Sequence, residues 1–104
     1  MSVYKLRFVQ RFKAEYEMEF MEVEREFAAL EKRVPEFPKG KRYKPYSGRE
    51  PNNTLVWECD FNSLEDAQKA LEFLCSDQRH EELFKKQVRY FEEPYTEIYE
   101  LLDF

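Results

Sequence analysis

Glycine, histidine and cysteine are scarce in this chain, and each scarcity excludes a class of site. Its two glycines leave no glycine-rich loop to bind the phosphates of a nucleotide. One histidine and two cysteines, without the spacing of metal ligands, predict that the protein builds no metal site. Cys59 and Cys75 also lack the dense pattern of a secreted disulfide framework, so we expect two free, buried thiols.

Long apolar runs are missing as well. No segment approaches the length of a membrane-spanning helix, and the N-terminus shows no signal-peptide pattern, so we expect a cytoplasmic protein with no membrane partner. A formal net charge of −5 disfavours nucleic acid as a partner. Aromatic residues are abundant, with ten Phe, seven Tyr and one Trp, and this apolar mass predicts one folded domain over residues 1–104.

Hydrophobic periodicity predicts strands and helices in a fixed order. The expected elements are a strand (3–12), a helix (14–33), an irregular edge strand (41–49), a strand (54–61), a helix capped by Ser63, a short helix (77–88) and a strand (95–102). A β-α-β-β-α-β order with right-handed crossovers predicts the ferredoxin-like α+β sandwich. Its four-stranded antiparallel sheet has the strand order 4-1-3-2.

Opposite charges would meet across neighbouring strands of this sheet. The first strand offers Lys5, Arg7 and Arg11 on its polar face, and its neighbours offer Glu58, Asp60 and Glu100. Apolar residues are expected on the same face, namely Val9, Val56, Ile98 and Leu102. Since two helices cover only one side of a sheet, this half-apolar side predicts a second layer, which a copy of the chain in a homodimer would supply.

A further signal lies in residues 55–67, LVWECDFNSLEDA, where a strand ends in an aromatic residue and SLEDA opens a helix, followed by the helical segment 77–84. On these segments and the order of elements, the chain resembles the dimeric α/β-barrel superfamily, in particular its NIPSNAP-like and antibiotic-biosynthesis-monooxygenase-like proteins. The resemblance implies two ferredoxin-like subunits with facing sheets, and a pocket between each sheet and its helices. It implies no single reaction, because the superfamily includes cofactor-free oxygenases, haem-handling proteins and proteins of no known activity.

His80 is the candidate catalytic residue, since it lies three and four residues before Leu83 and Phe84 on an inward-facing helical surface. It would act as a general base or a haem-type ligand; the alternative is a half-buried packing residue. The haem-handling members imply a helix histidine with Asn and Trp partners, and no second motif of that kind occurs here. We therefore expect no cofactor.

The candidate ligand-pocket residues are Trp57, Tyr43, Tyr95, Tyr99 and Arg49. Trp57 would line a pocket or pack as a core ring against the helices. The tyrosines would line a mostly apolar pocket for a small hydrophobic or aromatic molecule, or lie at a dimer interface. Arg49 belongs to residues 39–49, which hold five cations and no acid; this segment would steer an anionic ligand or keep an edge strand soluble.

Three functions are consistent with this sequence. The first is a small protein of uncharacterised role that binds a hydrophobic or aromatic molecule between sheet and helices. The second is a cofactor-independent monooxygenase-like enzyme in the same pocket, and the third is a structural or partner-binding module. An open cavity lined by His80, Trp57 and tyrosine side chains favours the enzyme, whereas a filled interior favours the module.

Overall fold

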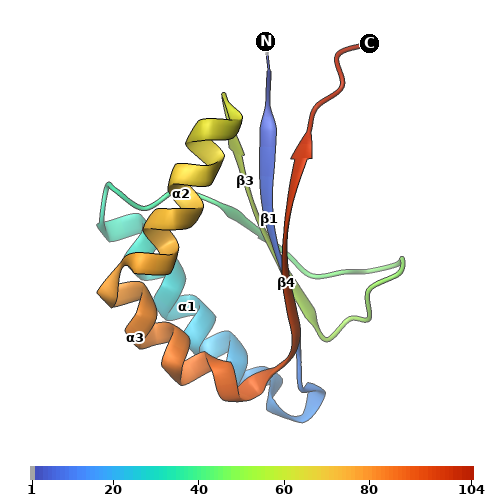
Figure 1. Cartoon of the computed structure of the whole chain (residues 1–104). Coiled ribbons are helices and arrows are strands. Elements are labelled where there is room, and N and C mark those ends of the chain that lie inside the picture. The colour runs from blue at the N-terminus through green and yellow to red at the C-terminus, as the bar shows by residue number, and fades with distance from the viewer. Residues whose placement is uncertain (1) are drawn as a thin grey trace.

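The computed structural model describes residues 2–104 and confirms the ferredoxin-like α+β fold. Its elements are β1 (Tyr4–Phe12), a 3-10 turn (Ala14–Tyr16), α1 (Glu17–Arg33), β2 (Lys41–Tyr43), β3 (Thr54–Phe61), α2 (Leu64–Ser76), α3 (Gln78–Gln87), a 3-10 turn (Val88–Tyr90) and β4 (Phe91–Glu100). All strand pairs are antiparallel, and the order β2-β3-β1-β4 is the predicted one. The helices lie on one face of the sheet, and both termini lie at the same end (Figure 1).

Alternation along β1 and β3 turns their large apolar side chains toward the helices. Leu6 and Trp57 pack with Leu30 of α1 in one buried cluster, while Phe12 packs with Phe20 of α1 in a second. The rings of Phe12 and Phe20 are stacked with centroids 4.5 Å apart. Since burying one such side chain contributes about 1.5–3 kcal/mol, the packing of α1 on the two central strands is a main source of stability.

Helix boundaries follow the capping residues. The Ser63 hydroxyl oxygen accepts a hydrogen bond from the Asp66 N–H at 3.0 Å, which confirms the predicted start of α2. Asp77 ends α2 and also caps α3, because its carboxylate accepts from the backbone N–H groups of Arg79 and His80. No helix within residues 2–104 is both long and apolar enough to cross a membrane.

The face of the sheet opposite the helices carries a ladder of ion pairs. Arg7 of β1 contacts Glu58 of β3 at 2.8 Å and Glu97 of β4 at 3.0 Å. The prediction that Glu100 takes part was wrong, because antiparallel pairing places Glu100 opposite Tyr4, and Ile98 packs with the helix-side cluster. Only the register with β1 defines the faces of β4, whose own sequence does not alternate cleanly.

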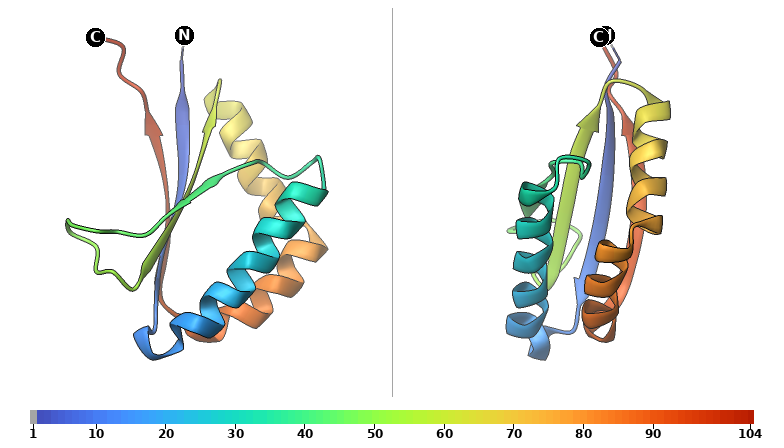
Figure 2. Two further views of the ribbon diagram at one scale, coloured as in Figure 1. Left: turned by 180° about the vertical axis from the view of Figure 1, so that it is seen from behind. Right: turned by 90° about the vertical axis from the view of Figure 1, so that its left-hand side faces the viewer.

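The loop between β2 and β3 projects from this same face, away from the helices (Figure 2). β2 ends at Tyr43, shorter than predicted, and Pro45, which has no backbone N–H to donate to a neighbouring strand, follows two residues later. Glu50 of the loop accepts a hydrogen bond from the Tyr95 hydroxyl at 2.8 Å. Val9 and Val56 are only 1% and 6% exposed, so part of the expected apolar outer face is already buried within one chain.

Candidate functional site

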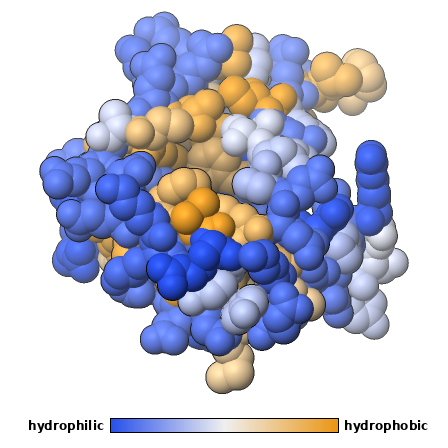
Figure 3. Space-filling view, turned by 60° about the horizontal axis from the view of Figure 1, so that its bottom comes forward, coloured by the Kyte–Doolittle hydropathy of each residue, from blue (hydrophilic) through white to orange (hydrophobic). Residues whose placement is uncertain are grey.

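A cavity of about 400 Å³ lies between the sheet and the helices. Figure 3 shows apolar side chains gathered in a hollow between hydrophilic rims. The residues that line the cavity are Phe8, Gln10, Glu24, Phe27, Glu31, Phe37, Pro38, Arg42, Trp57, Leu71, Leu74, Cys75, His80, Glu81, Phe84, Gln87, Phe91, Pro94, Tyr95 and Thr96. Its volume lies within the range of sites that hold a small organic molecule, about 300–1,000 Å³.

Aromatic rings form much of the wall. Phe8 and Trp57, on adjacent strands, are stacked with ring centroids 5.0 Å apart. The ring centroids of Phe84 in α3 and Phe91 at the start of β4 are 5.7 Å apart. Flat apolar walls of this kind offer stacking surfaces and few hydrogen bonds, so they suit an aromatic or hydrophobic body.

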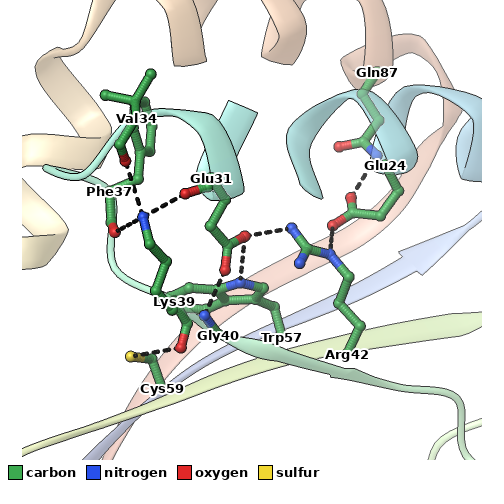
Figure 4. A network of polar contacts seen from close by, with 10 residues as sticks. All are labelled: Glu24, Glu31, Val34, Phe37, Lys39, Gly40, Arg42, Trp57, Cys59 and Gln87. Carbon is green, nitrogen blue, oxygen red and sulfur yellow. Dashed lines mark hydrogen bonds and ion pairs between the residues drawn. The ribbon is translucent and has the colours of Figure 1, made fainter. Parts of the chain in front are cut away.

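One part of the wall is polar, and there a buried ion cluster joins α1 to β2 (Figure 4). Nε of Arg42 lies 2.7 Å from Oε2 of Glu24, and Nη2 lies 2.8 Å from Oε2 of Glu31. Glu31 also accepts from the backbone N–H of Gly40 at 2.5 Å and from the indole N–H of Trp57 at 3.4 Å. Burial opposes the charge of Arg42, but the two carboxylates outweigh this effect and raise its pKa.

Gln87 extends the cluster from the end of α3. Its side-chain N–H group donates to Glu24 at 2.9 Å and to the carbonyl of Phe20 at 3.4 Å. Since both partners are acceptors, the amide nitrogen must face them, and this fixes the orientation of the carboxamide. The oxygen atoms of Gln87 and Gln10 are buried and have no hydrogen-bond partner in residues 2–104. Both oxygens are therefore enclosed by protein atoms and do not form part of the open surface of the cavity.

Close approach of the backbone holds Trp57 in place. A Cβ atom added to Gly40 would lie 2.1 Å from Cε2 of the Trp57 indole, a distance that no side chain tolerates. Glycine at this position lets the chain pass directly over the ring before β2 begins. Trp57 is thus both a buried core ring, 5% exposed, and a cavity wall.

His80 lines the cavity from α3, and its ring packs on Phe27 with centroids 4.8 Å apart. Burial lowers its pKa, although the carboxylates of Asp77 and Glu81 partly oppose this effect. The imidazole is therefore neutral at pH 7 and able to accept a proton. No hydrogen bond from another group in residues 2–104 orients this ring, in contrast to the base of a catalytic triad.

The structure brings some of the predicted site residues together and separates others. His80 and Trp57 line the sheet–helix cavity, whereas Tyr43, Tyr99 and Arg49 line a second depression on the opposite face of the sheet. Tyr95 borders both, with its hydroxyl bonded to the outer-face loop. A ligand in the cavity therefore has His80 and Trp57 beside it and the sheet between it and the other three.

Sequence reasoning missed the buried cluster. In α1, Glu24 and Glu31 follow Phe20 and Phe27 by four residues each, so they lie on the same helix face as these buried rings. This spacing was the one sequence signal that could have predicted their burial. Arg42 belongs to the basic segment 39–49, whose charge was interpreted as steering a ligand or keeping an edge strand soluble. It instead compensates the carboxylates of Glu24 and Glu31 in the interior. Lys44 of the same segment pairs with Glu17 at 2.8 Å.

Metal ligands do not gather here or elsewhere in the described chain: no three of its His, Cys, Asp and Glu side chains are placed to share an ion. Cys59 and Cys75 are both free, as predicted. The prediction that both are buried was wrong, because Cys59 is only partly buried and Cys75 lies exposed in the last turn of α2. Burial raises the pKa of the Cys59 thiol, and the negative charge of Glu31 raises it further. Cys59 is therefore protonated and unreactive at neutral pH.

No protein-family model matches the sequence, and no curated protein matches it. Solved structures do: a NIPSNAP family protein from Agrobacterium tumefaciens C58 has a TM-score of 0.77 at 17% identity, covering 98% of this chain and 88% of that chain. A second NIPSNAP family protein from the same bacterium, of unknown function, has a TM-score of 0.72 at 22% identity, covering 99% of this chain and 90% of that chain. A proposed antibiotic biosynthesis monooxygenase from Caulobacter crescentus CB15 has a TM-score of 0.76 at 12% identity, covering 98% and 92%. These similarities confirm the predicted resemblance, and the chain has the ferredoxin-like fold that it shares with NIPSNAP family proteins and antibiotic-biosynthesis-monooxygenase-like proteins.

Proposed function

We propose that this protein binds a small hydrophobic or aromatic molecule in the cavity between its sheet and its helices. The observation that carries the proposal is a cavity of about 400 Å³ with aromatic walls. Interiors that serve packing alone are filled to the density of organic crystals.

Calorimetric titration with naphthol, a neutral bicyclic aromatic probe, tests this proposal. Cys75 lines the cavity and is exposed, whereas the next residue, Ser76, is exposed and does not line it. We expect Cys75→Phe to weaken naphthol binding at least about tenfold by filling the rim, and the matched Ser76→Phe control to bind as the unchanged protein does. Equal binding by both variants, or no binding of naphthol or methoxynaphthalene by the unchanged protein, contradicts the proposal.

A second candidate function is a cofactor-independent monooxygenase-like reaction in the same cavity. The neutral imidazole of His80, exposed to the cavity, favours it. His80 would take a proton from an activated methylene group of the ligand. Molecular oxygen would then oxidise that CH2 to C=O, with one oxygen atom entering the product and the other leaving as water. The absence of an orienting partner for the ring makes this the weaker candidate.

Oxygen consumption in the presence of a benzylic ketone probe measures this second function. His80→Phe retains a ring against Phe27 and removes the base, so we expect the variant to fold. Loss of oxygen uptake with an unchanged melting temperature supports catalysis by His80. Uptake that is absent from the unchanged protein, or equal in both proteins, rejects it.

The protein is also proposed to form a homodimer through the outer face of the sheet. Helices cover the other face only, and Tyr43 and Tyr99 are 50% and 49% exposed on this one. The charges of Arg7, Glu58 and Glu97 are already paired within the chain, which lowers the cost of covering them. Light scattering at micromolar concentration measures the mass. A monomeric mass at that concentration contradicts the homodimer. The outer face of the sheet would then be free to bind a different partner, as in the partner-binding module.

A further inference from the structure

Charges on the outer face of the sheet, opposite the helices, are sorted by strand. Residues that stand opposite each other in antiparallel strands share a face, so the pairing of the strands assigns the charged residues of this face. They are Lys41 of β2, Glu58 and Asp60 of β3, Lys5, Arg7 and Arg11 of β1, and Glu93 and Glu97 of β4. Across the sheet order β2-β3-β1-β4, the signs of these four columns therefore run plus, minus, plus, minus.

One row across the sheet contains all four signs at a single level. Backbone pairing aligns it in the order Lys41, Glu58, Arg7 and Glu97. Glu58 pairs with Lys5 and Arg7, and Arg7 also pairs with Glu97, whereas Lys41 is exposed and forms no ion pair within residues 2–104. The row therefore ends in an unpaired cation at the β2 edge and in a carboxylate at the β4 edge.

A two-fold axis can relate two face-to-face sheets in two simple ways. An axis perpendicular to the strands lays each strand over the same strand of the second copy, so every column meets a column of its own sign. An axis along the strands reverses the order of the strands, so β2 lies over β4 and β3 lies over β1 of the second copy. Each column then meets the opposite sign. Because facing charges of like sign cost free energy, only the second arrangement is electrostatically self-complementary.

We propose that two copies of this chain pair through their outer faces about a two-fold axis along the strands, so that Lys41 in each copy meets Glu97 in the other. This inference rests on the proposed homodimer and adds its orientation. Aligned sheets pack about 10 Å apart, a gap that a lysine and a glutamate side chain reach across together. The neighbouring row carries no charge and meets itself in the same arrangement; it consists of Tyr43, Val56, Val9 and Tyr95.

The loop between β2 and β3 favours the same orientation. It projects from the outer face beyond the end of β2 (Figure 2). Arg49 of this loop is exposed, and the neighbouring Glu50 pairs with Arg11 instead. With β2 over β4 of the second copy, the loop passes the acidic edge strand of that copy, and Arg49 adds a second cation to this contact.

Sedimentation equilibrium in 0.15 M salt measures the dimer dissociation constant and tests the proposal by charge reversal. Lys41→Glu places two carboxylates opposite each other at both symmetric contacts, so we expect the dissociation constant to rise at least about tenfold. Lys85→Glu on the exposed surface of α3 is the matched control, because it changes the net charge equally and leaves the sheet untouched. We expect it to change the constant less than about threefold.

The combined variant Lys41→Glu with Glu97→Lys exchanges the two charges and keeps the net charge. Its dissociation constant is expected to return to within about threefold of that of the unchanged protein. Within one chain, three strand spacings of about 4.8 Å separate the two residues, which exceeds the Debye length of about 8 Å, so this rescue acts between subunits. Arg7 keeps its pair with Glu58, so we expect the variant to fold. If it does not, Lys41→Glu against Lys85→Glu decides.

The outcomes separate the orientation from the homodimer itself. A monomer of the unchanged protein overturns both. A dimer that responds equally to Lys41→Glu and Lys85→Glu overturns the orientation and leaves the homodimer intact, because an axis perpendicular to the strands exchanges one pair of like charges for another. A combined variant that dimerises as weakly as Lys41→Glu alone overturns the contact between Lys41 and Glu97.

Discussion

Replacing Arg42 by methionine removes the cation that holds α1 against β2. The side chain of Arg42 is 22% exposed, and those of its partners Glu24 and Glu31 are 8% and 11% exposed. Breaking a buried ion pair from one side costs about 3–5 kcal/mol, because the remaining charge loses its compensation. Partial exposure of the guanidinium screens some of this loss, so we expect the lower end, about 3 kcal/mol.

This loss is large compared with the total stability of a domain of this size, about 5–15 kcal/mol. It corresponds to a decrease of about 12–24 °C in melting temperature, taking about 4–8 °C per kcal/mol. Urea unfolding followed by circular dichroism measures it. Lys44→Met is the matched control, since Lys44 and Glu17 form an exposed pair with side chains 45% and 43% exposed, and less than about 1 kcal/mol is expected. A deficit no larger than that of Lys44→Met would refute the reasoning.

Three further predictions concern Gly40, His80 and the Ser63 cap of α2. Gly40→Ala should destabilise the protein by about 1–3 kcal/mol, because the added methyl group overpacks against Trp57, and it should shift the fluorescence emission of Trp57. Gly48→Ala should leave that emission unchanged, since no atom lies within 4 Å of the added methyl group, and equal spectra for the two variants contradict the prediction. The pKa of His80 is lowered in the folded state, so its neutral form contributes stability above pH 6.5, and this contribution is lost as the pH falls through the folded pKa. In His80→Phe, the free energy of unfolding in urea should therefore vary less between pH 7 and pH 5 than in the unchanged protein, and an equal variation in both proteins would contradict this. Ser63→Ala should cost about 1 kcal/mol in thermal unfolding by removing the α2 cap, and an unchanged melting temperature would show that the cap is dispensable.

Local patterns in the sequence were sufficient for the fold. β3 has the predicted bounds because its residues alternate between two faces from Thr54 to Phe61, with Val56 as the one apolar residue on the face away from the helices. α2 begins after Ser63 because the cap is a contact between residues three apart. β4 was less predictable: its faces follow the register with β1, and Pro94 stands inside the strand where the sequence suggested its start.

The site depended on contacts that no local pattern defines. Periodicity placed Trp57 on the helix-facing side and His80 on an inward surface, since both follow from spacing within one element. Whether Tyr99 shared their cavity depended on the register of β4, and pairing placed it on the other face. The sequence by itself determined which residues could be buried. Only the tertiary structure decided that Arg42, eleven residues beyond Glu31, turns inward to compensate two carboxylates, because the cost of burying a charge depends on which groups surround it after folding.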